Sequence, residues 1–423
     1  MDRTGKLGAL LRSARLNAIL TWSLVAAIAF TAGWRLLAGD LFWAGFAAVT
    51  AVVVILPPFA FRRPTVTLPW EVVLLATVPI VGIIAAPVQS IEQFTLHVSV
   101  AALALIIAVE LHVFTTVRMN DWFAVTFVVV TTLASEGVWS VLLWVSDELL
   151  GTQFIPDLPT LMIHFSAATV AGIGAGLVFM LYFRRIDELY RRCCPGIGAP
   201  PSTEWPPPAP KRLRDRIGIS ERRELQFVRL MQLTLVGILL VGIAESELSI
   251  IVNSVIALVV TQLPAILERD YDLSMDPGLV LWLTTAVFVH AVGTLGPYQS
   301  IEWWDTLAHA LSSSVVAAIG YTVLRVGTLH SDDVRIPPRL QVLFILLFVV
   351  AAGVLWEVIE FVVEQLANIL AIDDVLVQYG LRDTMFDLVF DIVGGLVVAI
   401  WGAAYLTESV TQISVWFETK RGN

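Results

Sequence analysis

The sequence has 423 residues, of which 57% are hydrophobic and only 15% are charged. Soluble domains contain about 25% charged residues, so this composition excludes an ordinary soluble protein and indicates a polytopic membrane protein. The net charge of −10 argues against nucleic acid as a partner, because binding to phosphates requires positive charge. The two cysteines, Cys193 and Cys194, are adjacent and supply neither a disulfide framework nor a zinc quartet.

Twelve apolar segments are long enough to be predicted as transmembrane helices. In chain order they are 17–38, 41–60, 70–87, 94–117, 121–149, 160–183, 226–246, 249–267, 278–296, 304–326, 340–369 and 383–406. The first segment follows four basic residues, but it is longer than the hydrophobic core of a signal peptide, so we expect it to be retained. The expected fold is an all-α polytopic membrane protein of about 12 transmembrane helices.

The basic residues predict the orientation of these helices. If the N-terminus is cytoplasmic, all but two of the 26 Lys and Arg residues fall on the cytoplasmic side, the exceptions being Arg35 and Arg382. Because cytoplasmic loops of membrane proteins are enriched in Lys and Arg, we expect a multi-pass protein of the cell membrane with both termini in the cytoplasm.

A polar segment, 184–224, separates the first six helices from the last six. It contains P-G-I-G-A-P-P-S-T-E-W-P-P-P-A-P between Arg-rich runs. This composition is typical of an extended cytoplasmic linker whose arginines lie against anionic headgroups. The expected domains are therefore an N-terminal six-helix region at 1–183, the linker, and a C-terminal six-helix region at 225–423.

The two six-helix regions resemble each other. Two seven-residue stretches match, A-P-V-Q-S-I-E at 86–92 and G-P-Y-Q-S-I-E at 296–302. Farther along, and in the same order, Trp139 falls opposite Trp356 and Gly172 falls opposite Gly395. These matches indicate a tandem duplication, and six helices in each copy would give parallel repeats. The first copy lacks most of the ionisable residues of the second, so we expect it to be a degenerate scaffold.

Three predicted helices of the second copy carry ionisable residues at helical spacing, which places each set on one helix face. The three stretches are W-W-D-T-L-A-H from 303, W-E-V-I-E-F-V-V-E from 356 and R-D-T-M-F-D-L-V-F-D-I-V-G-G from 382. A carboxylate at the centre of a membrane costs about 2.5–3.5 kcal/mol on insertion scales. So many carboxylates therefore require compensating partners.

The alternating directions of these helices predict matching depths, one helical turn of about 5.4 Å apart. The outermost level contains Asp305, Glu364 and Asp383. The next level inward contains His309, Glu360 and Asp387, and the deepest contains Glu357 and Asp391. They form an expected wedge that opens to the outer face, with His290 as a further candidate. The small residues Ser312–Ser314 and Gly394–Gly395 would allow the close helix contact that such a wedge requires.

The wedge suits either a divalent metal or proton transfer. Carboxylates and imidazoles are ligands for Mg, Mn, Zn or Fe, and helix bundles build metal sites from inward-facing Glu and His. The expected catalytic residues are Asp305, His309, Glu357, Glu360, Asp383, Asp387 and Asp391, of which Asp305, His309, Glu360 and Asp387 would be the metal ligands. Without a metal, neighbouring carboxylates share protons and suit a proton relay, or they merely hold three helices together. Arg382 would either pair with Asp383 or bind an anionic substrate group.

At these stretches the chain resembles the VanZ-like and YjdF-like families of integral membrane proteins. The resemblance covers about 300–405 and implies that Asp305, His309, Glu357, Glu360, Asp383 and Asp387 are signature positions. VanZ-like proteins are associated with glycopeptide-antibiotic resistance at the cell surface. This chain differs from them in being doubled and in having Asp391 where a neutral amide is more frequent.

The leading hypothesis is an intramembrane enzyme whose outward-facing Asp/Glu/His site acts on a lipid or lipid-linked headgroup. A cation- or proton-coupled transporter is the alternative that twelve helices in two repeats would suit, and a non-catalytic membrane scaffold is the third. The polar residues become sparse below Glu357 and Asp391, which favours a blind pocket over a continuous path. The expected partners are the bilayer and a lipid or lipid-linked substrate.

Overall fold

The computed structural model describes residues 14–85, 89–193, 220–330, 334–372, 375–376 and 378–406, together with positions 410, 413 and 416. Cys194, most of the predicted linker and both ends of the chain lie outside the described residues. Within them the secondary structure is helical, apart from one isolated antiparallel bridge between Arg118 and Arg335.

The chain divides into two compact units. The first contains α2 (Ala14–Leu37), α3 (Leu41–Ala60), α4 (Trp70–Ala85) and α5 (Gln89–Phe114), with α6 (Asp121–Leu150) as far as Ser135 and α7 (Leu158–Cys193) from Ser166. Asn17 on α2 fixes the start of α4. Its amide donates to the Leu68 carbonyl at 2.8 Å and accepts the Trp70 N–H at 3.0 Å.

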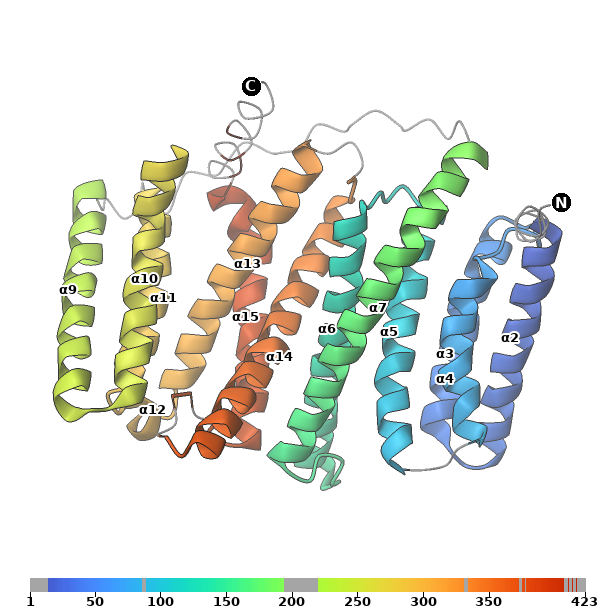
Figure 1. The fold of residues 1–423 in the computed structure, drawn as a ribbon, viewed down its shortest axis with the longest axis horizontal. Helices are drawn as coiled ribbons and strands as arrows, with labels where there is room; N and C mark the ends of the chain where they lie inside the picture. The colour runs from blue at the N-terminus through green and yellow to red at the C-terminus, as the bar shows by residue number, and fades with distance from the viewer. Residues whose placement is uncertain are drawn as a thin grey trace. The chain divides into compact units, whose positions relative to one another are not determined.

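The second unit contains Glu136–Phe165, from α6 and α7, and all the later helices. These are α9 (Glu221–Glu245), α10 (Leu248–Tyr271), α11 (Pro277–Gly293), α12 (Pro297–Ser300), α13 (Trp304–His330), α14 (Pro338–Leu370) and α15 (Leu381–Tyr405). Consecutive long helices run in opposite directions, so the α9–α10, α11–α13 and α14–α15 connections lie at one end of the unit (Figure 1). We call this end the connecting end.

Small residues bring α13 and α15 together, as the sequence predicts. A Cβ atom at Gly394 would collide with Ser313 Oγ and with the carbonyl oxygen of Ala310, so only glycine fits this contact. At the neighbouring Gly395, a Cβ atom would lie 3.3 Å from Val349 on α14. The glycine pair therefore lets α15 approach α13 closely while it packs against α14.

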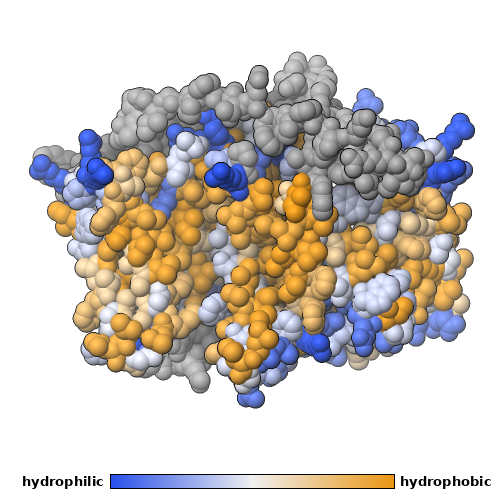
Figure 2. Space-filling view, turned by 180° about the vertical axis from the view of Figure 1, so that it is seen from behind, coloured by the Kyte–Doolittle hydropathy of each residue, from blue (hydrophilic) through white to orange (hydrophobic). Residues whose placement is uncertain are grey.

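Nine helices of the described chain are long and apolar enough to cross a membrane. Two others, α4 and α11, are apolar but shorter, and α15 is not among the nine. Helices lie over each predicted segment, but the number of twelve spans and their pairing into two six-helix repeats stay predictions. Hydrophobic residues cover much of the face seen in Figure 2, and hydrophilic residues gather toward its upper and lower edges.

One predicted helix ends earlier than expected. The segment 278–296 was predicted as one span, but α11 ends at Gly293 and a turn leads into the short α12. Gly296 has φ +125°, a conformation that other residues rarely adopt, and Pro297 then starts the new helix. This break places Tyr298 beside the end of α11.

Candidate functional site

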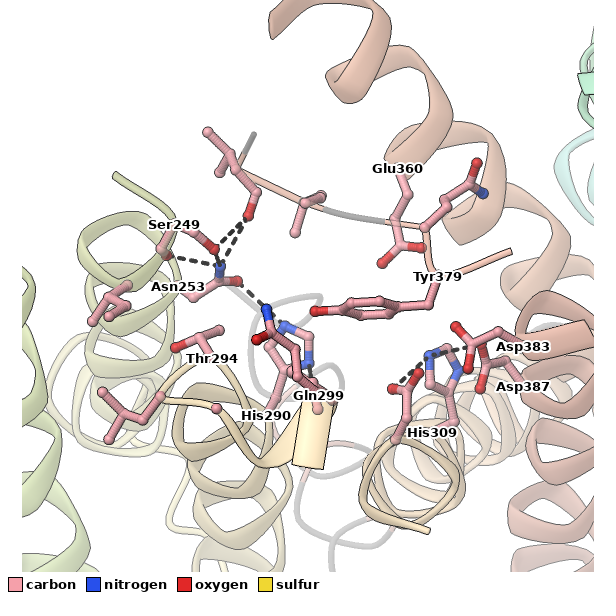
Figure 3. A pocket seen from close by; sticks show the side chains of 18 of the residues that line it. Ser249, Asn253, His290, Thr294, Gln299, His309, Glu360, Tyr379, Asp383 and Asp387 are labelled. Carbon is pink, nitrogen blue, oxygen red and sulfur yellow. Dashed lines mark hydrogen bonds and ion pairs between the residues drawn. The ribbon is translucent and has the colours of Figure 1, made fainter. Parts of the chain in front are cut away.

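The second unit contains a cavity of about 480 Å³ near its connecting end. Its lining comes from the start of α10, the end of α11, α12, the first turns of α13 and α15, the last part of α14, and the segment before α15. Figure 3 shows side chains from these elements pointing toward a common space. Six of the seven predicted catalytic residues line it: Asp305, His309, Glu357, Glu360, Asp383 and Asp387.

His309 on α13 lies among three carboxylates. Its Nε2 atom is 3.8 Å from Asp305 Oδ1 and 3.7 Å from Asp387 Oδ2. Its Nδ1 atom is 3.5 Å from Asp391 Oδ1, and Asp391 does not line the cavity. The imidazole therefore lies between a carboxylate pair at the cavity and a single carboxylate behind it. It contacts Asp391, which the helical spacing places one turn deeper, as closely as it contacts Asp387.

The position of Asp391 depends on a glycine on the neighbouring helix. A Cβ atom at Gly353 of α14 would collide with Asp391 Oδ2 and would lie 3.0 Å from Leu388. The side chain of Ser313 on α13 lies beside Asp391. Three helices therefore hold this buried carboxylate against the Nδ1 side of His309.

Glu357 on α14 is almost completely buried and has its own hydrogen-bond donors. Its Oε2 atom accepts from Thr384 Oγ1 at 2.9 Å and from Gln378 Nε2 at 3.0 Å, which joins α14 to α15 and to the segment before it. Buried polar groups need such partners, so these bonds account for the position of Glu357 without a ligand. Glu360, one turn farther along, accepts from Trp356 Nε1 at 2.9 Å.

His290 lies on the opposite side of the cavity, where the sequence places it as a further candidate. The Asn253 amide donates to the carbonyls of Ser249 and Val375, so its Oδ1 must accept from His290 Nε2, at 3.3 Å. The Tyr298 hydroxyl then donates to His290 Nδ1, at 2.6 Å. A neutral His290 thus satisfies both neighbours.

Two tyrosines outside the membrane-spanning helices belong to this side. Burial raises the pKa of Tyr298 above its ordinary value, and the carboxylates of Asp305 and Glu360 act in the same direction. Burial also raises the pKa of Tyr379, with the carboxylates of Asp305 and Asp383 as further causes. Both phenols therefore stay protonated at neutral pH.

The geometry fits a metal ion at three of the four expected ligands. Asp305, His309 and Asp387 each offer one ligand atom, and these atoms all lie within 4.8 Å of one another. Ligands at about 2.0–2.2 Å from one ion are roughly 3–3.5 Å apart, so small side-chain movements would complete the site. Glu360, the fourth expected ligand, is not in this group.

Other residues named from the sequence lie around the site. Asp383 hydrogen bonds with Asp305, as expected for residues at one level. Among the described residues Arg382 forms no ion pair with Asp383; it is exposed, and its guanidinium lies 5.4 Å from the centre of the Phe386 ring. Glu364 is not among the residues that line the cavity.

Comparisons with known proteins place the site within a matched region. Residues 227–408 match the family described as predicted membrane protein (DUF2238), and residues 5–67 match a domain of unknown function (DUF8268). The YjdF-like proteins belong to the first family, so the match confirms that part of the resemblance, whereas a relation to VanZ-like proteins is not shown. Together with the apolar helices, these matches indicate an integral membrane protein.

One curated relative is an uncharacterized protein of Thermotoga maritima. It is 35% identical to this chain over 133 residues, which are 31% of this chain. The matched part of the chain spans only 65% of that relative's length. No solved structure matches the chain.

Proposed function

We propose that the second unit binds a divalent metal ion through Asp305, His309 and Asp387, and that it acts on a lipid or lipid-linked headgroup. The observation that carries this proposal is the convergence of one ligand atom from each of these residues within 4.8 Å, at the wall of a cavity. A bound divalent metal would neutralise the crowded carboxylates, and such a metal can activate water or polarise an oxygen of the substrate.

Asp391 supports the metal proposal independently of the ligands. A histidine that binds a metal almost always donates its other ring N–H to a carboxylate or carbonyl, which fixes the tautomer. Asp391, 3.5 Å from Nδ1, supplies that partner. The lone pair on Nε2 is then directed toward Asp305 and Asp387.

Glu360 and Asp383 are the residues proposed to act on the substrate. Both line the cavity without belonging to the metal group, so each is available to take up or supply a proton. Glu357 is instead held by Thr384 and Gln378, which favours a supporting role for it.

The depth of the site favours a headgroup as the substrate. Asp387 lies six residues after the start of α15, which corresponds to roughly 9 Å along the helix. A headgroup at the membrane surface could reach this depth while its chains remain in the bilayer. Arg382, exposed on the first turn of α15, is proposed to bind an anionic part of the substrate.

The remaining architecture is proposed as the sequence predicts it. Twelve spans form two parallel six-helix repeats, of which the first is a degenerate scaffold, with boundaries at 183 and 225. The linker and both termini are cytoplasmic, so the connecting end of the second unit faces outward. Arg269 and Arg339, at the opposite end of their helices, support this orientation.

The enzymatic proposal can be tested in liposomes. The protein is reconstituted in a natural lipid extract with Mg²⁺, Mn²⁺ or Zn²⁺, and the lipids are analysed by mass spectrometry. We expect a metal-dependent change in one headgroup class that His309→Ala abolishes and that the matched control Glu364→Gln preserves. A change that persists in His309→Ala would contradict the proposal.

Transport of a cation or proton is the second candidate. It is favoured by the buried carboxylate of Asp391, which continues the acidic residues inward from the cavity. Ion flux into the same liposomes, lost in Asp391→Asn while headgroups remain unchanged, would replace the enzymatic proposal.

A further inference from the structure

The cavity has many more acidic side chains than a single metal ion requires. Six carboxylates line it, those of Glu247, Asp305, Glu357, Glu360, Asp383 and Asp387, and none of the described lining residues is Lys or Arg. The proposed metal site uses only Asp305 and Asp387. Because a nearby positive charge favours the ionised form of a carboxyl group, a second cationic group can be accommodated beside the metal.

The side of the cavity opposite the proposed metal ligands is aromatic. The ring centres of Tyr298 and Tyr379 are 6.3 Å apart with an interplanar angle of 36°. The ring centre of His290 is 5.6 Å from that of Tyr298 and 6.3 Å from that of Trp356. Tyr379 is 46% exposed, which is high for an aromatic residue that lines a cavity.

Tyr379 lies between acidic residues. Figure 3 shows its ring extending into the cavity, with Glu360 on one side and His309, Asp383 and Asp387 on the other. A cation on a face of this ring would therefore have both an aromatic partner and a carboxylate counter-charge. The Trp356 N–H bond to Glu360 helps to hold one of these carboxylates in place.

Ring faces distinguish an organic cation from a metal ion. Protein metal sites use oxygen, nitrogen and sulfur atoms, whereas the face of an aromatic ring attracts an ammonium group. The ring faces thus contribute nothing to the proposed metal site. A cavity of this volume lies within the range of small-molecule sites, so it has room for more than a metal ion.

We propose that Tyr298, Tyr379 and Glu360 form a subsite for an organic ammonium group, the amine of a headgroup. The inference deepens the proposed function because it names the substrate class. Only the reaction of the bound headgroup rests on the proposed function; binding of the ammonium group does not. A headgroup that carries both an ammonium and a phosphate would place its anionic part toward Arg382.

Binding can be measured by calorimetry on the full-length protein in detergent, with choline and its neutral carbon isostere 3,3-dimethylbutanol. We expect choline to bind and the isostere not to bind. Tyr379→Leu should weaken choline binding about tenfold or more, whereas Tyr379→Phe, which keeps the ring, should not. Tyr271→Leu is the matched control, because Tyr271 lies at the far end of α10 and contacts Trp416.

The source of the ammonium group is distinguished by lipids. Competition with choline is measured for nanodiscs of phosphatidylcholine, phosphatidylethanolamine or phosphatidylglycerol. Competition by either of the first two, but not by phosphatidylglycerol, would support a lipid headgroup as the source. Choline binding without such competition would support a free amine of the same chemistry.

Failure of this inference can be told apart from failure of the metal site. His309→Ala should remove metal binding and leave choline binding intact, because the substitution leaves Tyr298, Tyr379 and Glu360 in place. Equal binding of choline and its isostere, unchanged affinity in Tyr379→Leu, or loss of choline binding in a folded His309→Ala protein would each overturn the subsite.

Discussion

At the scale of single residues, the position of His309 decides what the cavity can do. Its two ring nitrogens face different surroundings: Nε2 faces Asp305 and Asp387 at the cavity, and Nδ1 faces the buried Asp391. This division matches the arrangement in which one nitrogen binds a metal and the other is oriented by a carboxylate.

The role of Asp391 predicts the effect of its neutral variant. Asp391→Asn keeps the size of the side chain but weakens its bond to the histidine, so metal affinity should fall about 10–100-fold without being abolished. Titration of the purified protein with Mn²⁺ or Zn²⁺ measures the affinity, and His309→Ala should abolish it. Unchanged affinity in Asp391→Asn would mean that Asp391 does not orient His309.

At the scale of secondary-structure elements, the close approach of α13 and α15 sets the geometry of the site. Asp305 and His309 come from one helix and Asp387 and Asp391 from the other, so any separation of the helices separates the ligands. Gly394 permits this approach because its position against Ser313 leaves no space for a Cβ atom.

The adjacent glycines provide a matched test of this contact. Gly394→Ala would force α13 and α15 apart, and overpacking of this kind costs about 1–3 kcal/mol. We expect it to lower both the thermal unfolding temperature in detergent and the metal affinity. Gly395→Ala, where the added Cβ would be 3.3 Å from the Val349 side chain and would need a shift of only a few tenths of an ångström, should have a much smaller effect. Equal effects of the two substitutions would contradict the proposed contact.

Helical spacing in the sequence predicts that Asp305, His309 and Asp387 face one another, because ionisable residues recur every three or four residues on their helices. The same spacing also placed Glu360 with these ligands and Glu364 beside Asp305, and the structure brings neither into the group.

Helical spacing could not reveal the neutral partners. Gln378 and Thr384 bind Glu357, and Asn253 binds His290, but neutral polar residues of this kind are frequent and carry no periodic signal.

The turn after α11 was also hidden in the sequence. Residues 278–296 read as one apolar segment, because hydropathy does not register the positive φ of Gly296. The signal that could have found it is the G-P dipeptide at 296–297, which typically marks a turn. Recognition of this turn would have added Tyr298 to the expected cavity residues.

At the scale of the whole molecule, the function proposed depends on which side of the membrane the cavity opens to. Apolar helices predict membrane insertion directly, and the distribution of Lys and Arg predicts the orientation. The assignment of Glu136–Phe165 to the second compact unit could not be predicted, because it depends on contacts between helices distant in sequence.

Cysteine labelling in intact cells tests the orientation. On a background with Cys193→Ser and Cys194→Ser, a cysteine is introduced at Ser300 in α12 or at Ser220 before α9; both positions are exposed. A membrane-impermeant maleimide should label Ser300→Cys in intact cells and Ser220→Cys only after the cells are opened. The reverse pattern would place the cavity on the cytoplasmic side and exclude an outer headgroup as substrate.

The central claim is that Asp305, His309 and Asp387 hold a divalent metal, and metal content tests it most directly. The full-length protein is purified without chelators, equilibrated in turn with Mg²⁺, Mn²⁺, Zn²⁺ and Fe²⁺, and analysed for bound metal beside His309→Ala and Asp387→Asn. The account predicts a stoichiometric ion in the unmodified protein that is lost in both folded variants. Absence of bound metal from the unmodified protein under every condition, or equal metal content in the variants, would contradict it.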